Sequence, residues 1–202
     1  MSITKQPEWL NNAVFYEIYP QSFNDTNADG IGDFNGIIEK LDYIRELGCN
    51  AIWINPCFKS PFGDAGYDVE DYYTAAPRYG TNEDLARVFS EAHARGMHVL
   101  LDLVPGHTAV THKWFKATRE ALKDIMRFWL AMGCDGFRVD MAGSLVKHDE
   151  DGKGTIALWQ NIREFLNKEF PDAAMVSEWG EPDKSLIGGF HMGFLLHFGP
   201  SH

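Results

Sequence analysis

Three apolar stretches of this chain each end in a carboxylate, and the three carboxylates are evenly spaced. Asp102, Asp140 and Glu178 stand 38 residues apart, about the length of one strand, one helix and two loops. Strands repeating at this interval predict a parallel sheet, because a parallel connection needs a crossover that is usually helical. The carboxyl ends of parallel strands meet at one edge of the sheet, so the acids are expected to converge there.

The rest of the chain keeps the same order of strand and helix. Apolar and β-branched runs predict strands over 13–19, 51–55, 97–104, 136–142, 173–179 and 188–198. Helical spacing of apolar residues predicts helices over 34–47, 82–95, 117–132 and 155–168, with a short helical turn at 184–187. Right-handed crossovers leave two α/β architectures, a (β/α) barrel or an open doubly wound sheet. No long polar linker divides the chain, so residues 1–202 are expected to form one domain.

The fourth expected strand carries an arginine and a carboxylate two residues apart. On a strand this spacing places Arg138 and Asp140 on the same face. A cation beside a carboxylate favours its ionised form, so we expect Asp140 to be an anion at neutral pH, as a carboxylate nucleophile must be. Glu178 lies beside Trp179 in an apolar run, where poor solvation suits it to the role of proton donor.

Acids at strand ends can also be purely structural. A single carboxylate in such a place commonly caps a helix or forms an ion pair in the core. Here three acids, an arginine and the histidine at position 107 share one repeating position at strand ends. That combination favours an active site over a structural role.

A glycine-containing loop follows the first expected strand. Its alternating oxygen donors are the side chains of Asp25, Asn27, Asp29 and Asp33, together with the main-chain carbonyl of Ile31. These positions match the first ligands of a calcium loop, although Gly36 stands where an EF-hand has its bidentate glutamate. The alternative is a polar turn held by its own side chains. Four side-chain donors in alternation exceed what a turn needs, so we expect a structural Ca²⁺ site.

Composition narrows the remaining classes of function. The chain is 45% hydrophobic and 23% charged, as in a globular protein. Its net charge of -11, with no basic stripe, argues against nucleic acid or an anionic membrane as partner. Cys49, Cys57 and Cys134 have neither metal-ligand spacing nor an even count, so we expect reduced, buried cysteines. The first residues lack the apolar core of a signal peptide and no run could span a bilayer, which predicts a cytoplasmic location.

Three segments resemble signature regions of the α-amylase family of glycoside hydrolases. They are Asp-Leu-Val-Pro-Gly-His at 102–107, Gly-Phe-Arg-Val-Asp at 136–140 and Val-Ser-Glu-Trp at 176–179. Residues 65–72 and the loop 25–33 are similar to the oligo-α-glucosidase and maltogenic branches of that family. The resemblance implies a partial (β/α)8 TIM-type barrel with about six parallel strands. It also implies cleavage or transfer of α-glucosyl units of an α-glucan or maltooligosaccharide, with retention of configuration.

The resemblance also implies a role for each matching residue. Asp140 would be the nucleophile and Glu178 the general acid and base of a retaining mechanism, which needs two carboxyl groups about 5 Å apart. Asp102 would support Arg138. The residues implied to line the subsite of the reacting sugar are Asp64, Tyr67, His107 and Arg138.

The sequence departs from the family pattern in two places. It lacks the large excursion that family members carry after the third strand, and it ends near the sixth strand, before the family's third acid and last two strands. A six-stranded sheet would leave two open edges, which we expect a second copy of the chain to cover in a homodimer, unless the sixth strand folds back over an edge. The alternative to a weak enzyme is an inert or sugar-binding remnant that retains the motifs.

Overall fold

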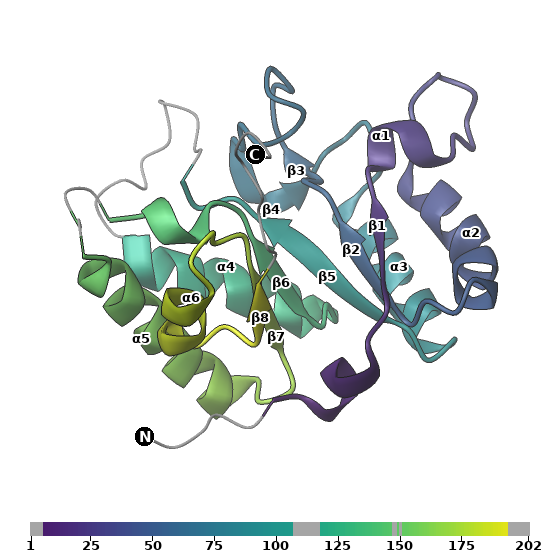
Figure 1. Cartoon of the computed structure of the whole chain (residues 1–202). Helices are drawn as coiled ribbons and strands as arrows, with labels where there is room; N and C mark the ends of the chain where they lie inside the picture. Colours follow the sequence, from purple (N-terminus) through teal and green to yellow (C-terminus); the bar gives the residue numbers. More distant parts are fainter. Residues whose placement is uncertain (1–5, 107–117, 147–148, 150, 194–202) are drawn as a thin grey trace, which may run out of the picture.

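The centre of the protein is a parallel sheet with six strands. The computed structural model describes residues 6–106, 118–146, 149 and 151–193 (Figure 1). The strands are β1 (Phe15–Ile18), β2 (Ala51–Ile54), β5 (His98–Leu103), β6 (Gly136–Val139), β7 (Ala174–Ser177) and β8 (Met192–Gly193). They lie in chain order, β1-β2-β5-β6-β7-β8, and every neighbouring pair is parallel.

This strand order decides between the two predicted architectures. A doubly wound sheet reverses its strand order at a switch point, whereas these strands follow one another around the sheet in the order of the sequence. The prediction of a partial (β/α)8 barrel with six parallel strands is therefore confirmed. For the sixth strand the structure describes residues 192 and 193, and the remainder of the predicted stretch lies outside the described residues.

Helices cover one face of the sheet (Figure 1). They are α2 (Phe34–Glu46), α3 (Asn82–His93), α4 (Thr118–Met132), α5 (Lys153–Glu169) and α6 (Pro182–Gly188). The chain also forms three short helical turns, η1 (Glu8–Asn12), α1 (Pro20–Phe23) and η3 (Ala142–Ser144). Under these helices, alternate strand residues such as Ile52, Leu101 and Phe137 are fully buried in the main core. The alternation of side chains along a strand turns the remaining residues to the opposite, inner face.

The start of α3 illustrates how local sequence sets the helix boundaries. Thr81 and Asp84 form a reciprocal capping box, in which each side chain accepts a hydrogen bond from the other residue's backbone N–H. At the other end, Gly96 takes a left-handed conformation with φ of +72° and ends the turn that leads into β5.

The inner face of the sheet has a smaller apolar cluster of its own. Leu100, Ala174 and Val176 contact Leu10 of η1, and Trp9, Phe15 and Met192 pack around them. The turn η1 therefore covers the amino-terminal end of the inner face. The carboxyl-terminal end of the same face is left for the polar residues described below.

A two-stranded antiparallel hairpin lies between β2 and α3, where the sequence predicts neither a strand nor a helix. Its strands are β3 (Phe58–Lys59) and β4 (Asp71–Ala75). Asp68 braces the connection between them by accepting hydrogen bonds from Ser60 Oγ at 2.6 Å and from the Gly63 N–H at 2.8 Å. The strands are short and their register shifts between Phe58 and Lys59, so the hydrophobic alternation that predicts a strand is too brief to detect. Among the described helices, none is long and apolar enough to cross a membrane.

Candidate active site

The candidate site lies where β5, β6 and β7 end. Asp102 pairs in register with Arg138, and Arg138 with Val176, so these three positions share the inner face. Asp140 and Glu178 stand two residues beyond Arg138 and Val176 and return to that face. Parallel pairing in this register therefore brings the three evenly spaced acids together, as the sequence predicts.

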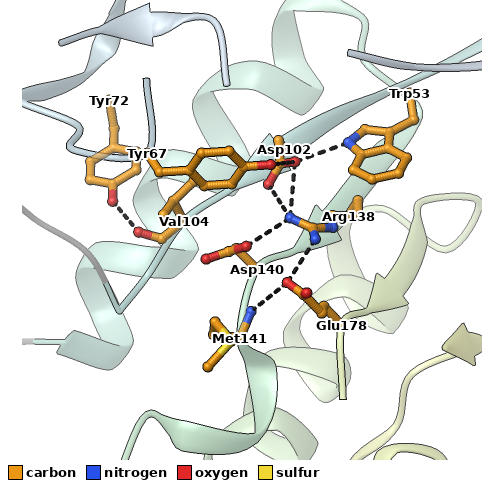
Figure 2. A network of polar contacts seen from close by, with 9 residues as sticks. All are labelled: Trp53, Tyr67, Tyr72, Asp102, Val104, Arg138, Asp140, Met141 and Glu178. Carbon is orange, nitrogen blue, oxygen red and sulfur yellow. Dashed lines mark hydrogen bonds and ion pairs between the residues drawn. The ribbon is translucent and has the colours of Figure 1, made fainter. Parts of the chain in front are cut away.

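Arg138 connects all three acids through one guanidinium group (Figure 2). Its Nη1 lies 2.9 and 3.0 Å from the two carboxylate oxygens of Asp102 and 2.9 Å from Asp140 Oδ1. Its Nη2 donates to Glu178 Oε2 at 2.7 Å. The side chains of Arg138 and Asp140 are 7% and 9% exposed, so the charges interact in a poorly solvated environment.

Burial changes the protonation expected for the acids. It raises the pKa of Asp140 to about 6, the hydrogen bond with Glu178 acts in the same direction, and Arg138 opposes both. Burial likewise raises the pKa of Asp102 to about 7, against the opposing effect of Arg138. Arg138 favours the anion of Asp140, as expected, but burial has the larger effect on the pKa. Since about 6 is below neutral pH, Asp140 is still mainly ionised at pH 7.

The β3–β4 hairpin brings a tyrosine over the acids. Tyr67 is half-buried, with its hydroxyl 3.5 Å from Asp102 Oδ2. Burial, followed by the charge of Asp102, raises the pKa of Tyr67, so the phenol remains neutral. Tyr72 of the same hairpin donates to the carbonyl of Val104 at 2.5 Å and ties the hairpin to the segment after β5 (Figure 2).

Two residues predicted for the sugar subsite, Asp64 and His107, are not found beside Arg138 in the described structure. Asp64 is exposed at a turn, where its main-chain carbonyl accepts a hydrogen bond from the Tyr67 N–H at 2.7 Å. No described hydrogen bond or ion pair connects its carboxylate to Arg138 and the three acids. His107 lies outside the described residues.

Two residues that the sequence did not single out contact the acids. Trp53 donates from Nε1 to Asp102 Oδ2 at 3.0 Å, and the Arg138 guanidinium carbon lies 4.8 Å from the centre of its ring. Because side chains alternate along a strand, the position of Trp53 on β2 could have identified it as an inner-face residue. The Met141 N–H donates to Glu178 Oε2 at 3.3 Å. Met141 has a φ of +45°, a backbone conformation that is rare outside glycine and is enriched at functional sites. No sequence pattern predicts this conformation.

The predicted calcium loop forms three successive side-chain turns. Asp25, Asn27 and Asp29 each accept a hydrogen bond from the N–H two residues ahead, at 2.8 to 3.0 Å. Asp25 also accepts from the Gly30 N–H at 2.8 Å, which lowers the pKa of its carboxyl group. Asp33 Oδ1 caps α2 through the Gly36 N–H at 2.7 Å, and its other oxygen holds Thr26.

The donor set of this loop fits Ca²⁺ chemically, because calcium takes carboxylate, amide and main-chain carbonyl oxygens. Asp25 Oδ2, Asn27 Oδ1, Asp29 Oδ1 and Asp33 Oδ1 each accept one described hydrogen bond and keep a lone pair for a metal ion, whereas Asp25 Oδ1 and Asp33 Oδ2 each accept two. The carboxylates of Asp25, Asp29 and Asp33 are not gathered within 4.8 Å of one another, however. In the described structure these side chains hold the loop through turn hydrogen bonds.

The sequence of this chain is similar to a known family profile and to known enzymes. The family profile described as "Alpha amylase, catalytic domain" matches residues 17–121. The oligo-1,6-glucosidase of Heyndrickxia coagulans is 47% identical over 141 residues, which is 68% of this chain and 25% of that protein. The trehalose-6-phosphate hydrolase of Bacillus subtilis (strain 168) is 52% identical over 122 residues, 60% of this chain and 21% of that protein.

Solved structures agree with the sequence matches. A mutant form of trehalulose synthase MutB superposes with a TM-score of 0.82 at 30% identity, covering 92% of this chain and 49% of that protein. The trehalose-6-phosphate hydrolase of Bacillus licheniformis gives a TM-score of 0.80 at 27% identity, with 93% and 49% covered. The chain thus spans a fifth to about a half of the length of these relatives.

One relative aligns with this chain over more positions than the chain has residues. The trehalose synthase/amylase TreS of Mycobacterium tuberculosis is 29% identical, and its alignment covers 98% of this chain over 276 positions. That is more than the 202 residues of the chain, so the relative contains residues that this chain lacks within the aligned region. With the family profile matching half of its residues and the Heyndrickxia relative 47% identical over two thirds of them, this chain belongs to the α-amylase family, within its catalytic domain.

Proposed function

We propose that this chain carries the carboxylate pair of a retaining α-glucan hydrolase or transglycosylase. The observation that supports this most is the sharing of Arg138 by Asp140 and Glu178 at the ends of adjacent strands. Retaining glycoside chemistry needs two carboxyl groups a short distance apart, one of them ionised. The inner-face aromatic residues beside them, Trp53 and Tyr67, offer surfaces for the apolar faces of sugar rings.

The reaction assigned to these residues has two steps. The carboxylate of Asp140 attacks the anomeric carbon while the glycosidic C–O bond breaks, and Glu178 gives a proton to the departing oxygen. In the second step, the oxygen of water or of an acceptor sugar hydroxyl attacks the anomeric carbon of the covalent intermediate. Glu178 takes the proton from that oxygen, and the bond to Asp140 breaks. Arg138 orients both carboxylates, Asp102 and Trp53 hold Arg138, and Asp64, Tyr67 and His107 are assigned to binding of the sugar.

The names of the relatives suggest the class of substrate. They include oligo-1,6-glucosidases, trehalose-6-phosphate hydrolases, trehalose synthases and a trehalulose synthase solved with sucrose. Short α-linked glucosides, including maltooligosaccharides, are therefore the substrates that we propose.

A second candidate function is sugar binding without turnover. Arg138 engages Asp140 and Glu178 at once, and the Met141 N–H adds a second donor to the same Glu178 oxygen. This arrangement fixes the positions of both carboxylates through hydrogen bonds to groups of the chain. It would suit a site that binds sugar hydroxyl groups without cleaving the glycosidic bond.

Two further proposals concern the environment of the site. The loop of Asp25, Asn27, Asp29, Ile31 and Asp33 is proposed to hold a structural Ca²⁺. A homodimer is proposed to cover β1 and β8, because each of these strands has a neighbour on one side only in the described sheet and an open edge invites pairing.

The function is tested by release of reducing sugar from maltotriose and isomaltotriose, and of glucose from trehalose. Purified chain is compared with Asp140→Asn and with Asp124→Asn, an exposed acid on α4. We expect turnover that Asp140→Asn abolishes and Asp124→Asn leaves unchanged, with kcat/KM falling as the pH drops through about 6 because the nucleophile becomes protonated. Equal rates for the wild type and Asp140→Asn would contradict the enzyme. Sugar binding in calorimetry without turnover would support the second candidate.

A further inference from the structure

A second group of ionisable side chains lies at the opposite end of the sheet from the acids. His93 ends α3, His98 begins β5, and Asp135 directly precedes β6. One ligand atom from each of these residues lies within 4.8 Å of the other two. His98 and Asp102 are four residues apart on β5, which separates the two clusters by about 13 Å along the strand.

Both histidine rings point a nitrogen at the same carboxylate. His93 Nε2 lies 2.8 Å from Asp135 Oδ2, and His98 Nδ1 lies 3.0 Å from Asp135 Oδ1. Burial would raise the pKa of Asp135, but the hydrogen bonds from His98, His93 and the Val99 N–H outweigh it and lower the pKa.

Neighbouring groups hold two of these side chains in place. The Val99 N–H donates to Asp135 Oδ2 at 2.8 Å. The ring of Trp9 stacks on His98 with a centroid distance of 4.2 Å and an interplanar angle of 13°. Such supporting contacts orient ligands before a metal arrives, which is how metal sites are commonly organised.

We propose that His93, His98 and Asp135 bind a Zn²⁺ ion, with water completing its coordination. Zinc takes imidazole nitrogen at about 2.0 to 2.1 Å and carboxylate oxygen at about 2.0 to 2.2 Å, so its ligand atoms lie about 3 to 4 Å apart. The present distances of 2.8 and 3.0 Å need only a small outward movement of the rings. Zinc takes the place of the hydrogens in these two contacts, and each ring keeps its proton on the other nitrogen.

Access and charge are compatible with this ion. The side chains of His93, His98 and Asp135 are 41%, 30% and 16% exposed, so Zn²⁺ can enter and water can reach it. Two neutral imidazoles and a carboxylate are a donor set that favours zinc over calcium or magnesium. The bound ion would link the connection between α3 and β5 to the start of β6, and its role would be to stabilise the amino-terminal end of the sheet.

The test is calorimetric titration of Zn²⁺ into the full chain after treatment with chelator, in excess Ca²⁺ to occupy sites built from oxygen ligands. We expect one Zn²⁺ per chain. His93→Gln keeps an N–H that can reach Asp135 but is a poor zinc ligand, and it should weaken binding by at least about tenfold, the loss typical even of outer-shell partners. Glu91→Gln, an exposed acid on the same helix, is the matched control and should bind as the wild type does.

Wild-type chain that takes up no Zn²⁺, or His93→Gln that binds Zn²⁺ with unchanged affinity, overturns the proposal. An NMR titration needs only the wild-type protein, so it tests the site even if His93→Gln fails to fold. On addition of Zn²⁺, ring-proton NMR signals of two of the eight histidines should shift. A spectrum in which no histidine signal responds to Zn²⁺ also overturns the site.

Discussion

Arg138 shows at the scale of a single residue how stability and function conflict. Its guanidinium contacts three carboxylates, and the cluster of four groups keeps a net negative charge when all of the acids are ionised. Burial is the main reason why the pKa values of Asp102 and Asp140 are raised, and repulsion between the acids adds to it. Active sites commonly store strain of this kind, because the reaction needs groups that folding alone would not place together.

The first prediction concerns the charge on Asp140. A pKa that is higher in the folded than in the unfolded chain contributes stability at low pH that is lost as the pH rises through about 6. Asp140→Asn should therefore raise the free energy of unfolding at pH 7, by up to about 3 kcal/mol from the size of the shift. Urea unfolding of both proteins at pH 7 and pH 4.5 measures this, and the gain should shrink at pH 4.5. A variant less stable than the wild type at pH 7 would show that the acid stabilises the fold.

The second prediction concerns removal of the shared cation. Arg138→Met leaves three poorly solvated acids without their partner, and breaking a buried ion pair from one side costs about 3 to 5 kcal/mol. Arg127→Met is the control, because Arg127 is exposed and pairs with Glu169 and Asp124 at the surface, a loss of about 1 kcal/mol or less. Similar midpoints of urea unfolding for the two variants would contradict the central role of Arg138.

At the scale of elements, the loop before α2 and the helix itself depend on one residue. Asp33 caps α2 with one oxygen and holds Thr26 of the loop with the other. An ordered loop thus supports the first turn of the helix. An ion bound in the loop would stabilise both.

The third prediction is that Ca²⁺ raises the melting temperature. An ion at about 100 times its Kd stabilises a folded chain by about 2.7 kcal/mol, which is about 5 to 10 °C in Tm for a chain of this size. Asp29→Ala should abolish the shift and leave Tm in chelator little changed. Asp33→Ala should also lower Tm in chelator, because it removes the helix cap at a cost of about 1 kcal/mol. Identical melting curves with Ca²⁺ and with chelator would leave the loop a simple turn.

At the scale of the whole molecule, the sheet does not close. β1 and β8 lie at opposite ends of the strand order and are not paired to each other in the described structure. A closed barrel removes both edges, whereas an open sheet leaves unpaired backbone groups that another chain can pair with. The inner face also keeps partly buried apolar residues beside these edges, including Phe15 on β1 and Met192 on β8.

The fourth prediction is therefore a homodimer. Light scattering should give twice the chain mass of 22.9 kDa, and hydrogen exchange should show protected amides along β1. Dilution should expose these amides together with the loss of mass, because both depend on the same contact. A monomer whose edge amides exchange freely would exclude the dimer.

Sequence alone determined the order of strands and helices, because apolar periodicity and helix caps such as Thr81 act between near neighbours in the chain. The even spacing of Asp102, Asp140 and Glu178 also predicted their meeting, since parallel strands align their carboxyl ends. The β3–β4 hairpin escaped prediction because its strands are too short to show a period.

Only the tertiary structure decided which charged groups contact one another. Arg138 was expected to act with Asp140 and Asp102, and it also reaches Glu178. Burial of Asp140 raised its pKa. Trp53 joined Asp102, and Asp135 came together with His93 and His98 from a distant part of the chain. Desolvation and contacts across strands depend on what surrounds a side chain in space, and that information is absent from its neighbours in the sequence.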